Sequence, residues 1–358
     1  MNFIVGKDII PHTDYKQLLD YTDDYPVCDH IVSFLNQWYD SSVLTYDFYT
    51  SGSTGSPKLI QHSREAMIAS AKLTENAFNY VKGDYALLCL PVNFVAGKMM
   101  IVRAIVSSLN LIISKVKTNP FEGVLYEGKI DFAPMTPMQF ELAKDHAFEL
   151  LNAVRVVLLG GAPVSNKLKE ETQIFDSNIF LGYGMTETLT HVALMKLNGY
   201  DRQKYFYGLE NISFNKDEHD CLIIEAQHLP NKILTNDIVA LFNESNFKWM
   251  GRRDNVINTG GVKVNSDELE RELSRHLKEN FFISSIKDDV LGSKIVIVLE
   301  GSVPSDKVNE LNVIFDQLKL KNSKPRKVYG LENFIYTKTG KLDKIAMMKL
   351  IESGQYFN

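Results

Sequence analysis

The interpretation of this sequence depends on one stretch, Tyr49-Thr50-Ser51-Gly52-Ser53-Thr54-Gly55-Ser56-Pro57-Lys58. Its glycines let backbone N–H groups approach a ligand, its hydroxyls donate hydrogen bonds, and Lys58 adds a positive charge, a combination that suits a polyphosphate. A flexible Ser/Gly surface loop is the alternative interpretation. Residues 43–49 can form a strand, and residues 64–81 have apolar side chains at helical spacing with Ser63 as N-cap. We therefore predict strand, phosphate loop and helix in that order.

The spacing of this loop differs from that of ordinary P-loop NTPases. Those proteins need a glycine, four further residues and then Gly-Lys-Ser/Thr. Gly52, Gly55 and Lys58 fall on another spacing, and no Ser or Thr follows Lys58. The pattern disfavours a Walker-type NTPase.

The composition indicates a globular protein without a nucleic-acid footprint. Of its 358 residues 45% are hydrophobic and 23% are charged, with a net charge of -5. The absence of a long apolar segment and of a signal-like N-terminus predicts a cytoplasmic protein. Cys28, Cys89 and Cys221 are far apart and are expected to be reduced core residues, and the eight histidines show no metal-ligand spacing. We expect no structural metal.

Three glycine-containing segments each follow a predicted strand. The pairs are strand 85–90 with segment 91–98, strand 154–159 with segment 160–162, and strand 178–181 with segment 182–188. Strands that alternate with helices indicate a mainly parallel sheet, and in such sheets ligands bind outside the carboxyl ends of the strands. All three segments are expected at that edge.

Arg103 is a charged residue inside an otherwise apolar helix predicted over residues 99–106. A charge there is costly unless it is paired or reaches a surface or a ligand. Arg103 therefore reaches solvent, pairs with a structural carboxylate, or binds an anionic group of a substrate.

The phosphate loop resembles that of the acyl-adenylate-forming superfamily, which reads Thr-Ser-Gly-Ser/Thr-Thr-Gly-x-Pro-Lys-Gly; Leu59 replaces the last glycine. Further motifs similar to those of this superfamily follow in order, so that the resemblance covers residues 43–345. They are Gly160-Gly161-Ala162, Tyr183-Gly184-Met185-Thr186-Glu187, Thr235-Asn236-Asp237 with Asn236 in place of glycine, the stretch 251–270, and the segment Thr337 to Lys344.

The resemblance implies a role for each matching residue. It implies that phosphates of ATP bind Thr50, Ser51, Gly52, Ser53, Thr54, Gly55, Lys58 and Thr186, that adenine contacts Gly160, Gly161, Ala162, Tyr183 and Gly184, and that ribose binds Asp237 and Arg252. It also implies that Glu187 holds Mg²⁺, that Lys341 acts with Lys58, Thr186 and Glu187 in catalysis, that Asp254 is a hinge, and that Gly260 and Gly261 lie beside the path of coenzyme A.

The implied fold is a large α/β N-terminal domain with a mainly parallel sheet, joined by a hinge to a small α+β C-terminal domain. We expect residues 1–253 to bind ATP and the acid and residues 254–358 to form the mobile domain that carries Lys341. The superfamily's phosphate loop usually lies well over a hundred residues into the chain. Here it begins at residue 49, so the N-terminal domain is expected to be truncated.

The implied activity is that of an AMP-forming ligase that joins a carboxylic acid to coenzyme A with ATP and Mg²⁺. Asn93 and Phe94 stand where peptide-synthetase domains have an aspartate for an amino group, which disfavours an amino acid. Residues 91–97 followed by Arg103 are most similar to the o-succinylbenzoyl-CoA synthetases of menaquinone biosynthesis, and Arg103 or Lys98 could bind the carboxylate that does not react. Asn93, Phe94, Lys98 and Arg103 are thus the candidate substrate residues.

Two other functions fit the same motifs, namely another aryl- or acyl-CoA ligase and a nucleotide-binding protein without catalysis. No nucleic acid or membrane partner is expected. A homodimer is one assembly that the sequence allows.

Overall fold

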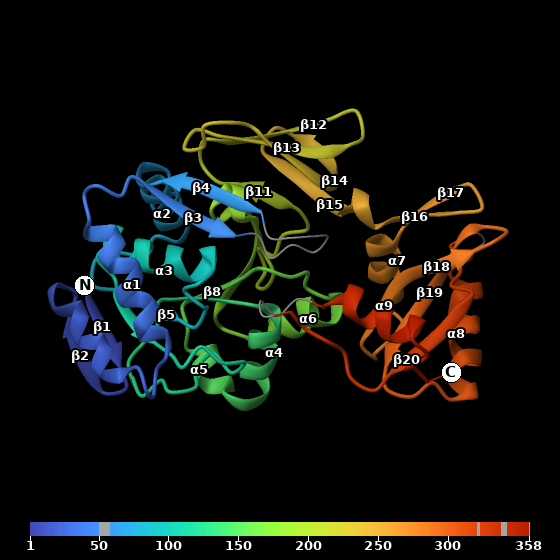
Figure 1. Ribbon diagram of the computed structural model, residues 1–358, viewed down its shortest axis with the longest axis horizontal. Helices are drawn as coiled ribbons and strands as arrows, with labels where there is room; N and C mark the ends of the chain where they lie inside the picture. Colours follow the sequence, from blue (N-terminus) through green and yellow to red (C-terminus); the bar gives the residue numbers. More distant parts are fainter. Residues whose placement is uncertain (50–57, 321–322, 338–341, 358) are drawn as a thin grey trace.

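The computed structural model describes residues 1–49, 58–320, 323–337 and 342–357 (Figure 1). Its centre is one large mixed sheet of 13 strands. In spatial order these are β12 (Ile212–Lys216), β13 (Cys221–Ala226), β14 (Ile233–Asn243), β15 (Asn246–Arg252), β11 (Phe206–Gly208), β10 (His191–Lys196), β9 (Asn178–Gly184), β8 (Val156–Leu159), β7 (Phe132–Met135), β5 (Tyr85–Leu88), β6 (Asn110–Ile113), β1 (Asn2–Val5) and β2 (Asp8–Pro11).

The middle of this sheet is parallel, as predicted. Strands β1, β6, β5, β7, β8 and β9 pair in parallel, whereas the strands from β10 to β15 pair antiparallel. The carboxyl ends of β5, β8 and β9 therefore share one edge, so the three glycine-containing segments that follow them also lie at that edge. Strand β7 was not predicted, because Pro134 made its segment look like a loop.

Helices cover both faces of the parallel part. Successive strand residues point to opposite faces, so Leu88 and Leu111 enter a core beneath one set of helices and Leu87 and Ile112 enter a second core. The first core contains residues of α1 (Val27–Tyr39), α2 (Arg64–Phe78) and α3 (Val95–Val106), and the second contains residues of α4 (Pro137–His146), α5 (Phe148–Asn152) and α6 (Asn166–Glu171). Short 3₁₀ segments are η1 (His12–Tyr21), η2 (Thr172–Ile174), η3 (Thr186–Thr188) and η4 (Arg253–Asn255).

The predicted order of strand, phosphate loop and helix is wrong in one respect. A second strand, β4 (Leu59–Ser63), follows the loop and pairs antiparallel with β3 (Thr45–Tyr49) in a separate two-stranded sheet. Leu-Ile-Gln-His-Ser has too few apolar residues to signal a strand, and its pairing with β3 decides its conformation. Helix α2 then begins as predicted, since the Ser63 hydroxyl accepts a hydrogen bond from the backbone N–H of Ala66 at 3.1 Å.

A smaller unit with its own sheets follows β15, on the right in Figure 1. It consists of the hairpin β16 (Val256–Thr259) and β17 (Val262–Asn265), helix α7 (Ser266–Leu273), the three-stranded sheet of β18 (Phe281–Asp288), β19 (Gly292–Glu300) and β20 (Lys327–Leu331), and helices α8 (Ser305–Gln317) and α9 (Lys344–Glu352). Its apolar side chains form two further cores. The expected α+β unit is present, and the boundary at residue 254 stays a prediction.

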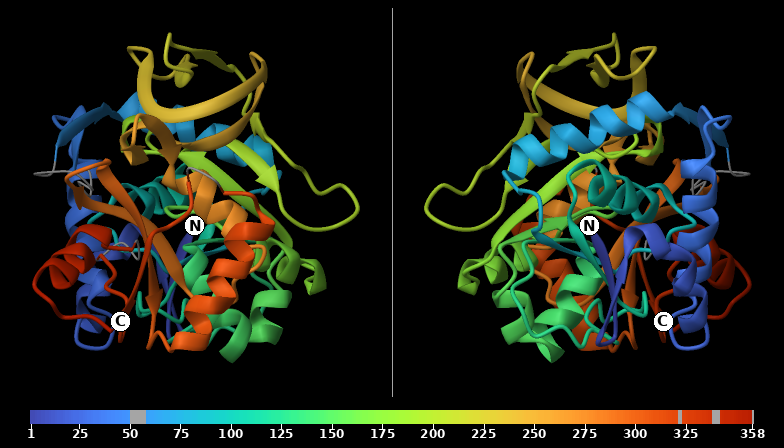
Figure 2. Two further views of the ribbon diagram at one scale, coloured as in Figure 1. Left: turned by 90° about the vertical axis from the view of Figure 1, so that its right-hand side faces the viewer. Right: turned by 90° about the vertical axis from the view of Figure 1, so that its left-hand side faces the viewer.

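The antiparallel end of the large sheet is strongly curved, which Figure 2 shows for β14 and β15. The pairing of these strands shifts register between Ile238 and Val239 and again between Leu241 and Asn243. Such bulges bend a strand and increase its twist. The curvature positions the side chains of β14 and β15 for the site described below.

The three cysteines are buried and form no disulfide, in agreement with the expected core role. Across the described ranges, no helix combines the length and apolar character needed to cross a bilayer.

Candidate active site

Asp237 lies in β14, which runs through the whole motif Thr235-Asn236-Asp237. The register pairs Asp237 of β14 with Arg252 of β15, and β14 also pairs with β13. The pairing with β13 is irregular at this motif, because Leu234 pairs with Ile223 and Ile238 pairs with Cys221, which leaves three residues of β14 opposite one residue of β13. A one-residue bulge in the pairing with β15, after Ile238, is a second irregularity beside the motif.

The Asp237 carboxylate is held from two sides. Its side chain is buried, its Oδ2 accepts a hydrogen bond from the Tyr183 hydroxyl at 2.6 Å, and its Oδ1 accepts one from Trp249 Nε1 at 3.0 Å. The Asp237 backbone N–H donates to Thr235 Oγ1 at 3.0 Å. Each oxygen keeps a lone pair, so the carboxylate is fixed in place and can still accept from a ligand. Trp249 was not among the predicted residues.

Tyr183 and Asp237, which two separate motifs predicted, are thus in direct contact. The Tyr183 ring packs edge-on against Phe247 with centroids 5.0 Å apart. Burial, followed by the negative charge of Asp237, raises the pKa of Tyr183 well above its usual value, so the hydroxyl stays a donor. Residue 184, next to Tyr183, must be a glycine, because a Cβ at this position would lie 2.1 Å from the carbonyl oxygen of Thr190.

The segment Gly160-Gly161-Ala162 forms the turn that follows β8. The Gly160 N–H donates to the Met135 carbonyl at 3.1 Å, which ties the turn to β7. Gly161 has φ of +83°, a conformation that favours glycine, and a Cβ there would meet no atom within 4 Å. The turn therefore presents open backbone at the carboxyl edge of the sheet.

Thr186 and Glu187 lie in η3, directly after β9. His62 Nε2 is 2.7 Å from the Thr186 carbonyl oxygen, and because a carbonyl only accepts, this nitrogen donates. Burial lowers the pKa of His62, and Thr186 and Glu187 oppose that shift. Strand β4 begins immediately after Lys58, so this contact ties the end of the phosphate loop to η3. The contribution of His62 to the site is apparent only from this contact, because no sequence motif includes it.

Several predicted residues lie outside the described part of the chain. They are Thr50, Ser51, Gly52, Ser53, Thr54, Gly55 and Lys341. Lys58 is described and stands between the loop and β4.

Glu187 is a single carboxylate in η3, and its chemistry fits magnesium held jointly by protein and substrate. Mg²⁺ is usually bound through one or two carboxylates together with substrate phosphates, rather than by an all-protein cage. Among the residues with described positions, no group of three His, Cys, Asp or Glu side chains could hold a metal ion alone. A single carboxylate at η3 agrees with such shared coordination.

The predicted substrate residues lie at the start of α3, which begins at Val95, earlier than expected. Asn93 is exposed, and Phe94 is half-buried at the N-cap position. Lys98 Nζ donates to the Asp47 carbonyl at 3.1 Å and lies 4.9 Å from the centroid of the Phe48 ring. Burial lowers the pKa of Lys98. These contacts join α3 to the β3–β4 hairpin.

Arg103 neither reaches solvent nor pairs with a carboxylate in the described structure. Its side chain is buried, with a residue exposure of 2%. Its guanidinium donates to Thr74 Oγ1 at 3.2 Å, Met100 Sδ at 3.4 Å and Thr190 Oγ1 at 2.6 Å, all of them neutral acceptors. Burial lowers the pKa of Arg103. The described contacts exclude two of the three predicted alternatives, namely solvent exposure and pairing with a structural carboxylate. The third alternative, binding of an anionic group of a substrate, stays a prediction.

Arg252, predicted to contact ribose or phosphate, is paired with the predicted hinge residue Asp254. Its Nε and Nη2 donate to the two carboxylate oxygens at 2.9 and 2.7 Å, and this pairing lowers the pKa of Asp254. Gly260 and Gly261 have φ of 56° and 82° and form the turn of the β16–β17 hairpin. Figure 1 shows this hairpin on the outer side of the small unit, far from β8.

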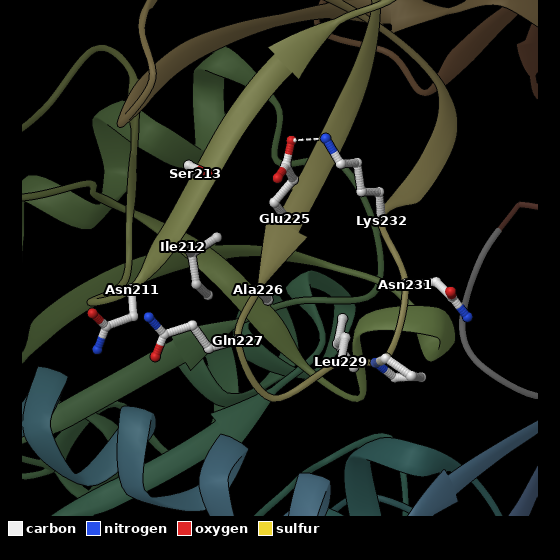
Figure 3. Close-up of a pocket in the computed structure, with 10 residues that line it drawn as sticks. Asn211, Ile212, Ser213, Glu225, Ala226, Gln227, Leu229, Asn231 and Lys232 are labelled. Atoms are coloured by element: carbon white, nitrogen blue, oxygen red, sulfur yellow. Dashed lines mark ion pairs between the residues drawn. The ribbon is translucent and has the colours of Figure 1, made fainter.

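A hollow of about 480 Å³ lies elsewhere, between β12, β13 and the connection to β14 (Figure 3). An ion pair of 2.7 Å between Glu225 and Lys232 stands on one side of it. None of the predicted site residues with described positions lines this hollow. The predicted site at the sheet edge at β5, β8 and β9 stays a prediction.

Comparison with known proteins indicates the family of this chain. The family model described as AMP-binding enzyme matches residues 14–209, more than half of the chain. The 2-succinylbenzoate--CoA ligase of Staphylococcus epidermidis is 24% identical over 83% of this chain and 68% of its own, and that of Haemophilus influenzae is 26% identical over 74% of this chain and 61% of its own. The chain therefore spans about two thirds of the length of these curated relatives.

Solved structures support the same conclusion. An acyl-CoA synthetase (AMP-forming)/AMP-acid ligase II-like protein from Dyadobacter fermentans is 31% identical, with a TM-score of 0.58 and 95% of both chains covered. The o-succinylbenzoate coenzyme A synthetase (MenE) from Bacillus subtilis, in complex with ATP and magnesium ion, shares the fold at a TM-score of 0.69 and 18% identity, over 84% of this chain and 69% of its own. With the family match and the geometry of the site, these similarities show that the chain belongs to the AMP-binding enzyme family.

Proposed function

We propose that this protein is an AMP-forming acid–thiol ligase that activates o-succinylbenzoate with ATP and transfers it to coenzyme A, a step of menaquinone biosynthesis. The observation that carries the substrate assignment is the buried guanidinium of Arg103, which has only neutral partners in the described structure. A buried charge without a counter-charge is costly. A dicarboxylic acid would supply the missing anion with the carboxylate that does not react.

The nucleotide would bind at the carboxyl edge of the sheet. Tyr183 and Gly160 to Ala162 would contact adenine, the fixed carboxylate of Asp237 would accept from the ribose hydroxyls, and Arg252 would lie beside the ribose and phosphates. Residues 50–55 with Lys58 and Thr186 would hold the phosphates. Glu187 would hold magnesium, which supplies positive charge to the phosphate oxygens when it is bound.

In the first half-reaction, a carboxylate oxygen of the acid attacks the α-phosphorus of ATP, and pyrophosphate leaves with the electron pair of the broken P–O bond. Negative charge builds up on the phosphoryl oxygens. Lys341 would stabilise this charge, because a fixed cation is most effective where charge develops. Asn93, Phe94 and Lys98 would line the acyl side.

In the second half-reaction, the thiolate of coenzyme A attacks the acyl carbon and AMP leaves. The small unit, residues 254–358, would rotate about Asp254 relative to residues 1–253, which withdraws Lys341 and brings Gly260 and Gly261 to the site. A glycine turn would let the backbone lie close to the pantetheine arm. Alternation of domains would separate the two half-reactions.

The proposal is supported by relatives named 2-succinylbenzoate--CoA ligase and by MenE structures with the same fold. It includes a cytoplasmic location. A homodimer is the assembly to be examined first, by light scattering of the purified protein.

The test is pyrophosphate release from Mg-ATP with o-succinylbenzoate, benzoate and a medium-chain fatty acid in parallel, followed by mass detection of the CoA thioester. We expect release and thioester with o-succinylbenzoate. Arg103→Ala should lose this activity, whereas Arg202→Ala, an exposed arginine with a side chain 51% accessible, should keep it. Unchanged turnover of o-succinylbenzoate by Arg103→Ala would contradict the substrate assignment. Activity of the wild type with another acid instead would keep the proposed reaction class and discard o-succinylbenzoate as the substrate.

A further inference from the structure

The hydrogen bonds of Arg103 leave part of its guanidinium available. A guanidinium carries five N–H groups, and three of them are directed at Thr74, Met100 and Thr190. Two N–H groups, one on each terminal nitrogen, therefore have no partner in the described structure. The shortest of the three contacts, 2.6 Å, is the one from Nη2 to the Thr190 hydroxyl.

The Thr190 hydroxyl also contacts His191, whose Nδ1 lies 2.8 Å from Thr190 Oγ1. A hydroxyl can donate one hydrogen bond and accept two, so Thr190 Oγ1 accepts from Arg103 and is hydrogen-bonded to His191 Nδ1 at the same time. His191 is buried on β10, and burial, followed by the positive charge of Arg103, lowers its pKa well below the usual value. The imidazole therefore stays neutral, and a continuous series of hydrogen bonds runs from Arg103 through Thr190 to His191.

One buried polar atom at the end of this series of side chains, His191 Nε2, has no hydrogen-bond partner in the described structure. Buried polar groups are rarely left unpaired. This nitrogen and the two remaining N–H groups of Arg103 are unsatisfied polar groups around a buried cation that has no counter-charge, which is typical of a binding site rather than of a closed core.

We infer that Thr190 and His191 are positioning residues for Arg103, which hold its guanidinium so that the two remaining N–H groups face the unreactive carboxylate of the acid. This inference rests on the proposed function, since it concerns the same substrate. These three side chains act on one another through hydrogen bonds alone. His191 holds the Thr190 hydroxyl in place, Thr190 accepts from Arg103, and Arg103 contacts the ligand.

A purely structural role for Thr190 makes a different prediction. Its backbone carbonyl accepts from the Thr188 hydroxyl at 2.8 Å and lies against Gly184. Thr190→Val has the same shape and keeps these backbone contacts while it removes the hydroxyl. Thr190→Ser keeps the hydroxyl and is the matched control.

The experiment measures kcat and KM of both variants with o-succinylbenzoate and with 3-benzoylpropionate, the analogue without the aromatic carboxylate. Because hydrogen bonds to a charged group are worth roughly tenfold in affinity, we expect Thr190→Val to raise KM for o-succinylbenzoate about tenfold. KM for ATP and all constants for 3-benzoylpropionate should stay unchanged, and Thr190→Ser should behave like the wild type. Calorimetric binding of o-succinylbenzoate should show the same loss of affinity without turnover.

A second pair of variants covers the case in which Thr190→Val does not fold. His191→Asn keeps a hydrogen-bonding group near the position of Nδ1, and His191→Leu removes it, so only the latter should raise KM for o-succinylbenzoate. Wild-type affinity in Thr190→Val or His191→Leu overturns this inference alone. A wild-type protein that neither binds nor turns over o-succinylbenzoate overturns the proposed function together with it.

Discussion

At the scale of single residues, Trp249 shows that a nucleotide-binding carboxylate can depend on a side chain outside the motif. Asp237 accepts from Tyr183 on β9 and from Trp249 on β15, two strands separated in the sheet by β10 and β11. Both bonds hold the carboxylate in a single orientation. The proposed ribose contact therefore needs the indole N–H as well as the aspartate.

Trp249→Phe keeps an aromatic ring and removes this donor, so the Asp237 carboxylate gains freedom to rotate. We expect KM for ATP to rise about tenfold, since a hydrogen bond to a charged group contributes about 1.5 to 3 kcal/mol. KM for the acid should stay unchanged in a pyrophosphate-exchange assay. Trp38→Phe is the matched control, because Trp38, the other tryptophan of the sequence, packs against Phe34 and Tyr46. Equal KM values for ATP in both variants would contradict the assignment.

Arg103 allows a second prediction at this scale. Its replacement by an apolar side chain should weaken binding of the acid and stabilise the folded protein. In Arg103→Met, the Thr74 hydroxyl would still donate to the Ser70 carbonyl, and the Thr190 hydroxyl would remain hydrogen-bonded to His191. No buried donor is orphaned, and an unneutralised buried charge disappears. We expect the free energy of unfolding to rise by about 1 to 3 kcal/mol in urea denaturation, while acid-dependent activity is lost. Arg103→Lys retains the charge and should show no such gain; reduced stability of Arg103→Met would count against a ligand-binding role.

At the scale of elements, the sequence predicted the start of α2 better than the strands beside it. Ser63 caps this helix as expected, because a cap depends on neighbours within three residues. Strand β4 escaped prediction because its pairing with β3 decides its conformation. Helix α2 also ends earlier than expected, at Asn79 in the left-handed conformation.

The same distinction holds for the site. Tyr183 and Asp237 could be predicted because each belongs to a motif that is complete within a few residues. Trp249, His62 and Thr190 could not, since each contributes through a contact between elements that are distant in the sequence. Local patterns reveal the groups that meet the ligand, and the folded chain reveals those that hold them.

The β16–β17 hairpin leads to a prediction for the second half-reaction. Gly261 has φ of +82°, and a Cβ there would meet no atom within 4 Å. Gly261→Ala therefore costs about 1 kcal/mol of backbone strain without a clash, and it adds a methyl group where pantetheine is proposed to pass. We expect normal pyrophosphate exchange and slower thioester formation, measured by mass spectrometry. Gly292→Ala is the control, because Gly292 also has a positive φ and lies in open space. If Gly292→Ala slows thioester formation equally, backbone strain and not a blocked pantetheine path causes the slower reaction.

At the scale of the whole molecule, the contacts between the two units correspond to one stage of the proposed cycle. Asn166 of α6 donates to the Arg271 carbonyl of α7 at 3.2 Å, and Arg271 Nη1 donates to the Trp249 carbonyl at 3.2 Å. Tyr336 lies close enough to Glu141 of α4 for that carboxylate to contribute to its raised pKa, after burial and Glu300. The chain on the N-terminal side of Lys341 thus approaches the large unit, while the glycine hairpin faces away. We propose that this arrangement is the one in which the adenylate forms.

Arg271 should therefore stabilise the adenylating arrangement at the expense of the other one. The Arg271→Ala variant loses the bond to Trp249, and rotation about Asp254 breaks the same bond in the wild type, so the variant should leave this arrangement more easily. We expect pyrophosphate exchange to fall about three- to tenfold, in line with a net contribution of roughly 1 kcal/mol for a hydrogen bond. Thioester formation from supplied acyl-adenylate should be unchanged or faster. Arg275 is an exposed arginine just after the same helix, and Arg275→Ala should affect neither half-reaction. An equal decrease of both half-reactions in Arg271→Ala would indicate damage to the small unit instead of a shift between arrangements.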